Sequence, residues 1–347
     1  MRKRLLGRTG VVVSEFALGT MTFGQEADEK AAIALLDHYV ESGGNLVDTA
    51  DVYPPPGPKG TSEEFIGRWL NANRGRRDAI ILATKCRGRM DPGTNSEGLS
   101  RHWIIRACEA SLRRLQTDHI DLYQAHAWDM ATPIEETLAA FDQLVRSGKV
   151  RYIGVSNFTG WQLERAVLIA RHSGFSVPVS LQPQYNMLAR EIEWELVPVC
   201  LEEGLSILPW GPLGQGWLSG KYSRDSAPTG ATRLGEDPNR GVEAYDRRNI
   251  ERTWNVVNAV RAVASELGVP PARVALRWLA DRPGVTAPIL GARTVEQLRD
   301  NLMAADISLS AEQTKRLDEV SAPVTPDYPY RLLREGNAER RALLQNL

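Results

Sequence analysis

The sequence predicts a (β/α)8 barrel, the TIM-barrel architecture, with a parallel strand before each of eight helices. Short apolar segments alternate with segments that repeat apolar residues at helical spacing, and counting from Phe16 gives eight such pairs. No break in composition divides the 347 residues, so we expect one domain over 1–347. An open doubly wound sheet is disfavoured, because no predicted strand is followed by Gly-x-Gly-x-x-Gly and no domain boundary is visible.

The elements follow in order along the chain. Leu5-Leu6 and Val11-Val12-Val13 flank a Gly-containing turn and predict an N-terminal β-hairpin. The predicted strands are 16–20, 45–47, 79–84, 120–125, 150–155, 179–182, 205–209 and 286–290. The predicted helices are 28–41, 62–70, 100–115, 132–146, 159–171, 191–203, 249–267 and 294–302, with Asp28, Ser62, Ser100 and Thr132 as start signals. We expect an extra helix at 270–278 before the last strand and a C-terminal helix at 310–320, followed by a tail.

Composition limits the partners. The chain carries 42 basic and 43 acidic residues, which gives no electrostatic reason to expect nucleic acid or an anionic membrane. No apolar run is long enough for a signal peptide or a membrane span. Cys86, Cys108 and Cys200 are odd in number and lack metal-ligand spacing. We therefore expect a cytoplasmic protein with reduced thiols and no metal, either a monomer or a homo-oligomer.

Polar residues stand where three neighbouring strands are predicted to end. Asp48, Lys85 and His126 end the second, third and fourth strands, and Tyr53 follows in the loop after Asp48. Each alone has a structural explanation, such as a loop hydrogen bond or a solvated charge. Strand ends of a barrel converge on one face, where Lys85 would favour the phenolate of Tyr53 and Asp48 would keep the ammonium charged. With His126 donating to a carbonyl oxygen, the set can deliver a proton to a developing alkoxide, given a hydride source.

The later strand ends suit a cofactor that supplies hydride. Ser156, Asn157 and Gln182 can hydrogen-bond a carboxamide, and Trp210 offers a flat face for stacking. The glycine-rich segment 210–221 ends in Lys221, as expected of a loop over phosphates, although ordinary turn chemistry also explains its glycines. Arg293 directly precedes the start of the last barrel helix, where free N–H groups favour a phosphate.

Together these motifs resemble the aldo-keto reductase family over nearly the whole chain. Asp48-Thr49-Ala50-x-x-Tyr53, with Lys85 and His126, is similar to the catalytic tetrad of that family. Further similar motifs are Asp121-Leu122-Tyr123-Gln124-x-His126, Gly154-Val155-Ser156-Asn157-Phe158 and Gln182-x-x-Tyr185-Asn186. The segment 210–221 and Gly291-x-Arg293-x-x-x-Gln297-x-x-Asp300-Asn301 resemble the bacterial branch related to potassium-channel β-subunits. The resemblance implies an NADP(H)-dependent enzyme that reduces an aldehyde or ketone to an alcohol, with Tyr53 as general acid.

The resemblance also implies which residues surround the ligands. Around the nicotinamide half we expect Gly19, Thr20, Met21, Asp48, Ser156, Asn157 and Gln182, with Trp210 stacked on its ring. Along the pyrophosphate we expect Gly211, Pro212, Leu213, Gly214, Gly216, Lys221 and Arg233, and near the adenosine phosphate Gly291, Arg293, Gln297, Asp300 and Asn301. Trp128 is expected to border the small-molecule carbonyl substrate. Residues 54–58 and 87–90 depart from the family pattern near the substrate, so the substrate itself stays open.

Other functions remain open from the sequence. Within the family, a keto- or enoyl-sugar nucleotide intermediate is an alternative substrate, although His126 favours reduction of C=O over C=C. A Schiff-base aldolase using Lys85 as nucleophile is a second class, which the neighbouring Asp48 disfavours by keeping the amine charged. A third class is a cofactor-sensing, non-catalytic partner of a membrane protein.

Overall fold

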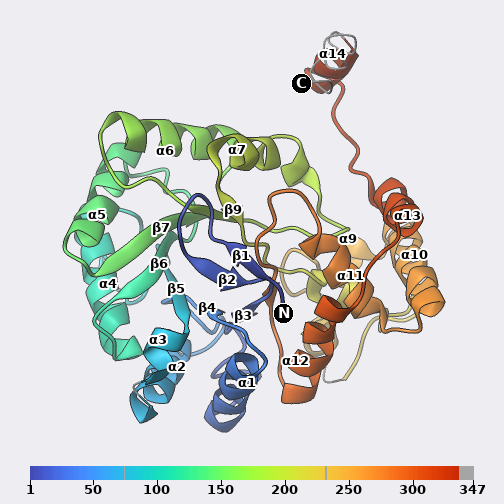
Figure 1. The fold of residues 1–347 in the computed structure, drawn as a ribbon, viewed down its shortest axis with the longest axis horizontal. Coiled ribbons are helices and arrows are strands. Elements are labelled where there is room, and N and C mark those ends of the chain that lie inside the picture. The colour runs from blue at the N-terminus through green and yellow to red at the C-terminus, as the bar shows by residue number, and fades with distance from the viewer. Residues whose placement is uncertain (74, 231–232, 336–347) are drawn as a thin grey trace.

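Eight parallel strands form a barrel in the computed structural model, which describes residues 1–73, 75–230 and 233–335 (Figure 1). They are β3 (Ala17–Gly19), β4 (Leu46–Asp48), β5 (Ile81–Cys86), β6 (Ile120–Ala125), β7 (Val150–Ser156), β8 (Ser180–Gln182), β9 (Ser206–Ile207) and β10 (Ile289–Leu290). In the sheet, β10 pairs with β3 and the others follow in chain order to β9. Backbone bonds from Ile207 N to Gly284 O (3.0 Å) and from Ile289 N to Pro209 O (2.8 Å) join the two edges. The predicted (β/α)8 architecture is therefore confirmed.

Helices surround the strands in the predicted order (Figure 1). The barrel helices are α1 (Glu29–Glu41), α2 (Thr61–Ala72), α4 (Arg101–Leu115), α5 (Ile134–Arg146), α6 (Gly160–His172), α7 (Leu196–Glu203), α10 (Glu251–Leu267) and α12 (Val295–Leu302). The predicted extra helix is α11 (Pro271–Ala280), and α13 (Ala311–Ser321) follows the barrel. Short additions are α3 (Gly75–Ala79), α8 (Arg233–Glu236), α9 (Tyr245–Arg248), α14 (Tyr330–Glu335), η1 (Glu191–Glu193), η2 (Gly214–Ser219) and η3 (Met303–Asp306). Among the described helices, none combines the length and the apolar character that crossing a bilayer requires.

Prolines explain most of the boundaries that differ from prediction. The predicted helix 191–203 is split into η1 and α7, and α7 begins only two residues before Pro198, because proline fits a helix without loss only in the first turn. The predicted strands 205–209 and 286–290 shorten to β9 and β10, since Pro209 and Pro288 have no N–H for the ladder. The strand predicted from residue 79 begins at Ile81, because the residues before it form α3.

The start signals were partly right. Asp28 accepts a hydrogen bond from Ala31 N (2.8 Å) and Ser100 accepts one from Trp103 N (3.2 Å), so both are N-caps. Ser62 was wrong as a cap, because α2 starts at Thr61 and the Ser62 hydroxyl donates to Thr20 instead. Thr132 was also wrong, because Pro133 holds the N-cap position of α5.

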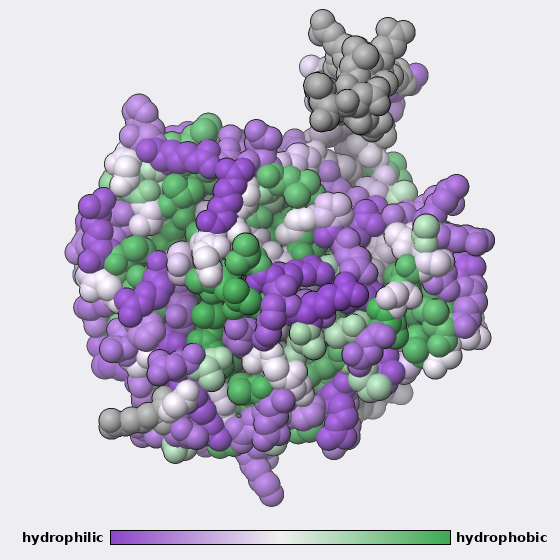
Figure 2. All heavy atoms as spheres, in the orientation of Figure 1, coloured by the Kyte–Doolittle hydropathy of each residue, from purple (hydrophilic) through white to green (hydrophobic). Residues whose placement is uncertain are grey.

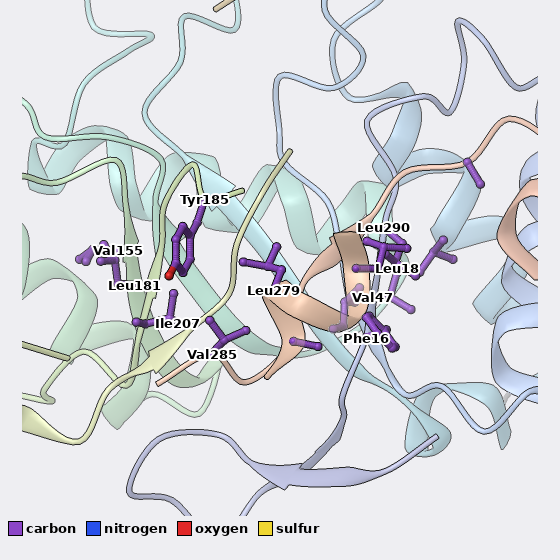
Figure 3. Close-up of a cluster of buried hydrophobic side chains, with 14 of the residues drawn as sticks. Phe16, Leu18, Val47, Val155, Leu181, Tyr185, Ile207, Leu279, Val285 and Leu290 are labelled. Carbon is purple, nitrogen blue, oxygen red and sulfur yellow. The ribbon is translucent and has the colours of Figure 1, made fainter. Parts of the chain in front are cut away.

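Alternate residues of each strand face opposite sides of the barrel wall. Leu18, Val47 and Leu290 belong to the large cluster that packs against helix side chains such as Leu279 of α11 (Figure 3). Their immediate neighbours Ala17, Leu46 and Ile289 belong to a smaller cluster inside the barrel. The period-two alternation of a strand thus builds one apolar layer outside the wall and another within it.

The N-terminal hairpin closes one end of that interior. It consists of β1 (Lys3–Leu5) and β2 (Val12–Ser14), as predicted, and Leu6 and Val13 join the interior cluster. The hairpin lies in front of the strands in Figure 1, and the same face in Figure 2 mixes hydrophilic and hydrophobic side chains. Because this end is filled, access to the barrel strands comes from their C-terminal ends.

A buried ion pair fastens the hairpin end to α11. Arg277 and Glu15 are both 0% exposed, and Nη1 of Arg277 lies 3.1 Å from Oε2 of Glu15. The same guanidinium donates to both oxygens of Asp281, at 2.7 and 2.6 Å. Glu15 also accepts from the backbone N of Arg2 (2.8 Å). The charge of Arg277 is therefore fully paired, and so is that of Glu15.

Replacing Arg277 by Met should lower the free energy of unfolding by up to about 3–5 kcal/mol, because it removes the nearer counter-charge of the buried Glu15 and leaves it only Arg4, at 3.8 Å. The exposed pair of Arg316 with Glu266 provides a matched control. Arg316→Met should cost no more than about 1 kcal/mol, as surface pairs do. Urea unfolding of both variants measures the difference, and equal losses would show that burial does not set the strength of the Arg277 contact.

Candidate active site

Interior-facing positions change from apolar to polar toward the C-terminal ends of the strands. Ala17, Leu46, Ala83 and Leu122 face the interior of the barrel. Two residues further along the same strands, facing the same way, are Gly19, Asp48, Lys85 and Gln124. The same alternation that builds the core therefore brings ionisable side chains together at one end of the barrel.

Asp48 and Lys85 form a buried ion pair at this end. Nζ of Lys85 donates to Oδ2 of Asp48 (2.7 Å) and to the backbone oxygen of Thr49 (2.7 Å). The second carboxylate oxygen of Asp48 accepts from Nε2 of Gln182 (2.8 Å) and from Nε2 of Gln124 (3.3 Å). Both charges are thus surrounded by hydrogen bonds that fix their positions.

Tyr53 lies next to the ammonium group. Nζ of Lys85 is 5.0 Å from the centroid of the Tyr53 ring, and the two side chains share a hydrogen bond. Burial by itself lowers the pKa of Lys85, but attraction to Asp48 and Tyr53 outweighs it, so the pKa is raised. The ammonium is therefore cationic at neutral pH and stabilises negative charge on the phenol oxygen.

His126 follows β6 and completes the group of four predicted residues. Its ring meets the ring of Tyr53 edge-on, with centroids 5.8 Å apart. Burial, Lys85 and Arg87 together lower the pKa of His126 from 6.5 to about 3. A neutral imidazole keeps one N–H donor and one acceptor, so it can donate to a carbonyl oxygen beside Tyr53 without carrying charge.

Gln124 and Glu26 are site residues that our sequence reasoning did not assign. Gln124 lies two residues before His126 and faces the same way, so the period of two pointed to it. Glu26 stands in the loop after β3 and pairs with Arg293, 267 residues away. Nothing in the local sequence around Glu26 signals that contact.

Asn157 connects the ends of three strands on the predicted nicotinamide side. Its Nδ2 donates to the backbone oxygen of His126 (2.9 Å), and its Oδ1 accepts from Nε1 of Trp210 (3.0 Å). The neighbouring Ser156 hydroxyl donates to Gln182 O (2.7 Å). The structure therefore brings these four predicted residues together, although the amide nitrogen of Gln182 is engaged by Asp48.

The predicted residues at the end of β3 and just after it pack tightly. A side chain at Gly19 would place its Cβ 2.6 Å from Ile289, so the position needs a glycine. The Thr20 hydroxyl donates to the backbone oxygen of Asp48 (3.1 Å) and is fully buried, so it shapes the loop from within. Met21 follows it and is partly buried.

The glycine-rich segment turns close to the side chain of Lys221. Gly211, Pro212 and Leu213 lead into η2, which contains Gly214 and Gly216. Gly216 has φ +101°, and a Cβ there would lie 2.8 Å from Nζ of Lys221. Burial lowers the pKa of Lys221, and the nearby Arg293 lowers it further against the opposing effect of Glu26. Two cations that repel each other over a glycine turn fit the phosphates of a dinucleotide, because an anion relieves that repulsion.

Arg293 is held by two carboxylates. Its Nε lies 3.2 Å from Glu26 and its Nη1 lies 2.8 Å from Glu236 of α8. Arg240 pairs with the other oxygen of Glu26 (2.9 Å). A phosphate at Arg293 would therefore replace carboxylate partners rather than water.

The remaining predicted residues near Arg293 take different positions. Gln297 accepts from the backbone N of Arg293 (2.9 Å), and Asn301 is buried. Asp300 is paired with Arg273 of α11, so the structure turns its carboxylate toward a helix contact. Gly291 directly follows β10. The side chain of Arg233 lies outside the part of the chain that the structure describes.

Trp128 stands two residues beyond His126 in an aromatic group. Its ring lies 5.2 Å from that of Phe158 and 5.4 Å from that of Trp161, centroid to centroid. Trp161 is 57% exposed. Flat apolar surfaces therefore border the side of the site that carries His126.

Fold and side chains together define a (β/α)8 barrel with an acid–base group at the C-terminal end of its strands. Residues 15–322 match the profile of the Aldo/keto reductase family. The chain belongs to this family, and it is a carbonyl-reducing oxidoreductase of the kind that uses a nicotinamide cofactor.

Three relatives illustrate the range of this similarity. The "Uncharacterized oxidoreductase YrpG" of Bacillus subtilis (strain 168) is 41% identical over 324 residues, which cover 92% of this chain and 96% of that protein. The "Aryl-alcohol dehydrogenase [NADP(+)]" of Phanerodontia chrysosporium is 34% identical, with 96% and 89% covered. The "Probable voltage-gated potassium channel subunit beta" of Oryza sativa subsp. japonica is also 34% identical, with 88% and 92% covered.

The lowered pKa of His126 predicts how acid affects stability. In the unfolded chain a histidine takes up a proton near pH 6.5, whereas His126 in the fold does so only near pH 3. Between these values the unfolded state binds more protons, so stability falls as the pH falls, by at most about 1.4 kcal/mol per pH unit. The free energy of unfolding of His126→Gln should therefore rise relative to that of the wild type as the pH drops from 7 to 4. Urea unfolding at several pH values measures this difference. A difference that does not change with pH would contradict a neutral His126.

Proposed function

We propose that the protein is an NADP(H)-dependent reductase that converts an aldehyde or ketone into an alcohol, with Tyr53 as the general acid. The observation that carries the proposal is the contact of Tyr53 with the charged Lys85, which Asp48 holds in turn. We place the activity in the cytoplasm, on a small-molecule substrate. The three free, buried cysteines support a reducing compartment.

Each residue of the group has one role in this proposal. Tyr53 donates its phenolic proton to the oxygen of the carbonyl as that oxygen becomes an alkoxide. Lys85 stabilises the phenolate that remains, and Asp48 keeps the ammonium charged and aimed. His126, neutral because of its lowered pKa, donates a hydrogen bond that orients the carbonyl oxygen. A reduced nicotinamide supplies the hydride when it is bound.

Arg293 and Lys221 support NADP(H) as the cofactor. Arginine can bond a phosphate through two N–H groups at once and stays charged at any ordinary pH. The extra phosphate of NADP(H) gives Arg293 a partner that NAD(H) lacks. The fungal relative, which carries NADP(+) in its name, supports the same choice.

The Schiff-base aldolase is less well supported. A lysine nucleophile must lose its proton, whereas attraction to Asp48 and Tyr53 raises the pKa of Lys85 despite burial. Borohydride trapping with a carbonyl substrate separates the two reactions, because only an aldolase would become covalently labelled at Lys85.

Tyr53→Phe should reduce NADPH-dependent turnover by roughly 10²-fold or more, the scale of general acid catalysis, and leave NADPH affinity unchanged. The substitution removes only the phenolic oxygen, so the ring contact with His126 is kept. Steady-state kinetics on a good aldehyde substrate measure the loss. Near-normal turnover would exclude Tyr53 as the proton donor.

Arg293→Ala should raise the dissociation constant of NADPH about 10- to 100-fold, since a charge-assisted bond contributes about 1.5–3 kcal/mol. NADH binding should hardly change. Arg273→Ala, which removes the partner of Asp300, is the matched control and should leave the ratio of the two constants as it is. Fluorescence titration measures both cofactors, and equal losses for both would mean that Arg293 supports the loop without reading the 2′-phosphate.

A further inference from the structure

Arg87 has a backbone conformation that a residue with a side chain rarely adopts. It follows Cys86 at the end of β5, two residues after Lys85, and its φ is +142°. Positive φ is strained for any residue other than glycine. The turn is nevertheless fixed, because Gly98 N donates to Arg87 O (2.8 Å). Gly88 fits closely against Val52, since a Cβ on it would lie 2.3 Å from Cγ1 of that residue.

The guanidinium of Arg87 lies on the His126 side of the site. Its Nε donates to the backbone oxygen of Trp128 (3.2 Å), two residues beyond His126. After burial and Lys85, Arg87 is the third cause of the lowered pKa of His126. The side chain is exposed, so its charge is accessible to a ligand from solvent.

Arg87 and its neighbour Arg89 differ in their hydrogen bonds, because only Arg89 is paired with a carboxylate. Within residues 1–73, 75–230 and 233–335, the two terminal nitrogens of Arg87 form no hydrogen bond or ion pair with the protein, although its charge contributes to lowering the pKa values of the nearby Glu97 and Asp129. Arg89, two residues on, donates through Nε to Glu97 (3.0 Å). The two terminal nitrogens of a guanidinium form the edge that binds a carboxylate bidentately.

The residue whose backbone oxygen holds Arg87 also belongs to an aromatic group. This residue, Trp128, packs against Phe158 and the exposed Trp161. An aromatic ring gains from such contact, and an anionic group on that ring gains from the unpaired edge of Arg87.

We propose that Arg87 binds substrate and selects aromatic aldehydes or ketones whose ring carries a carboxylate, with Trp128 and Trp161 against the ring. This inference rests on the proposed carbonyl reduction and names its substrate class. The strained backbone of Arg87 is then the means by which a long cationic side chain is directed over the site from the strand end that also carries Lys85.

The test compares 4-carboxybenzaldehyde with its neutral methyl ester, methyl 4-formylbenzoate, in NADPH-dependent reduction at fixed ionic strength. The wild type should prefer the carboxylate. Arg87→Gln and Arg87→Gly should lower kcat/KM for the carboxylate about 10-fold or more, mainly through KM, and change the ester less than about 2-fold. Glycine accepts the positive φ, so Arg87→Gly folds without strain. Arg89→Gln is the matched control and should change neither substrate.

Terephthalate binding provides a readout that does not depend on turnover. Quenching of tryptophan fluorescence in the presence of NADP+ should report binding to the wild type and a loss of at least about 10-fold in Arg87→Gln. No binding to the wild type, or equal effects of Arg87→Gln on acid and ester, would overturn the inference. Reduction of both aldehydes, with no effect of Arg87→Gln on the carboxylate substrate, would sink this inference alone. Failure of NADPH to reduce either aldehyde, with terephthalate still bound through Arg87, would sink only the proposed reduction.

Discussion

The ion pair of Asp48 and Lys85 is the interaction on which the rest of the site depends. Two opposite charges buried in a barrel lose their hydration, and the loss is offset only if every remaining donor and acceptor finds a partner. Gln182, Gln124 and the Thr49 carbonyl supply those partners from different strands. The ammonium group of Lys85 also interacts with the phenol of Tyr53. The barrel therefore holds a cation beside the phenol, and this charge would stabilise a phenolate at Tyr53.

Parallel strands explain why so much of this arrangement could be predicted from sequence. Several strands are apolar runs with a polar residue at their C-terminal end or just after it, and parallel neighbours bring those ends to the same edge of the sheet. Asp48, Lys85 and Asn157 could therefore be assigned to one region from the sequence alone, although they are far apart in the chain. The strands cut short by Pro209 and Pro288 were predicted too long, because apolar composition does not reveal where the ladder lacks an N–H.

Contacts between loops could not be predicted in this way. Arg293 was expected to face a phosphate, and nothing in its sequence indicated Glu26 or Glu236 as partners. These contacts depend on how the loops after β3 and after η2 cross the end of the barrel. The path of a loop leaves no periodic pattern in the sequence. The positive φ of Arg87 is equally invisible in a sequence, because arginine gives no signal for it. Side chains on strands can thus be assigned from periodicity, whereas the contacts that loop residues such as Arg293 and Arg87 make cannot.

The closure of the barrel by the hairpin and by β10 has a consequence for biosynthesis. β3 needs β10 as a neighbour, and Arg4 donates to the carbonyl oxygen of Ala280, 276 residues later in the chain. A ribosome adding 5–20 residues per second reaches β10 only after roughly 15–60 s. Until then Leu6, Val13 and Ala17 have no completed interior to enter. The first residues to leave the ribosome are among the last to find their final surroundings, so the nascent chain needs protection of its N-terminal apolar segments during most of its synthesis.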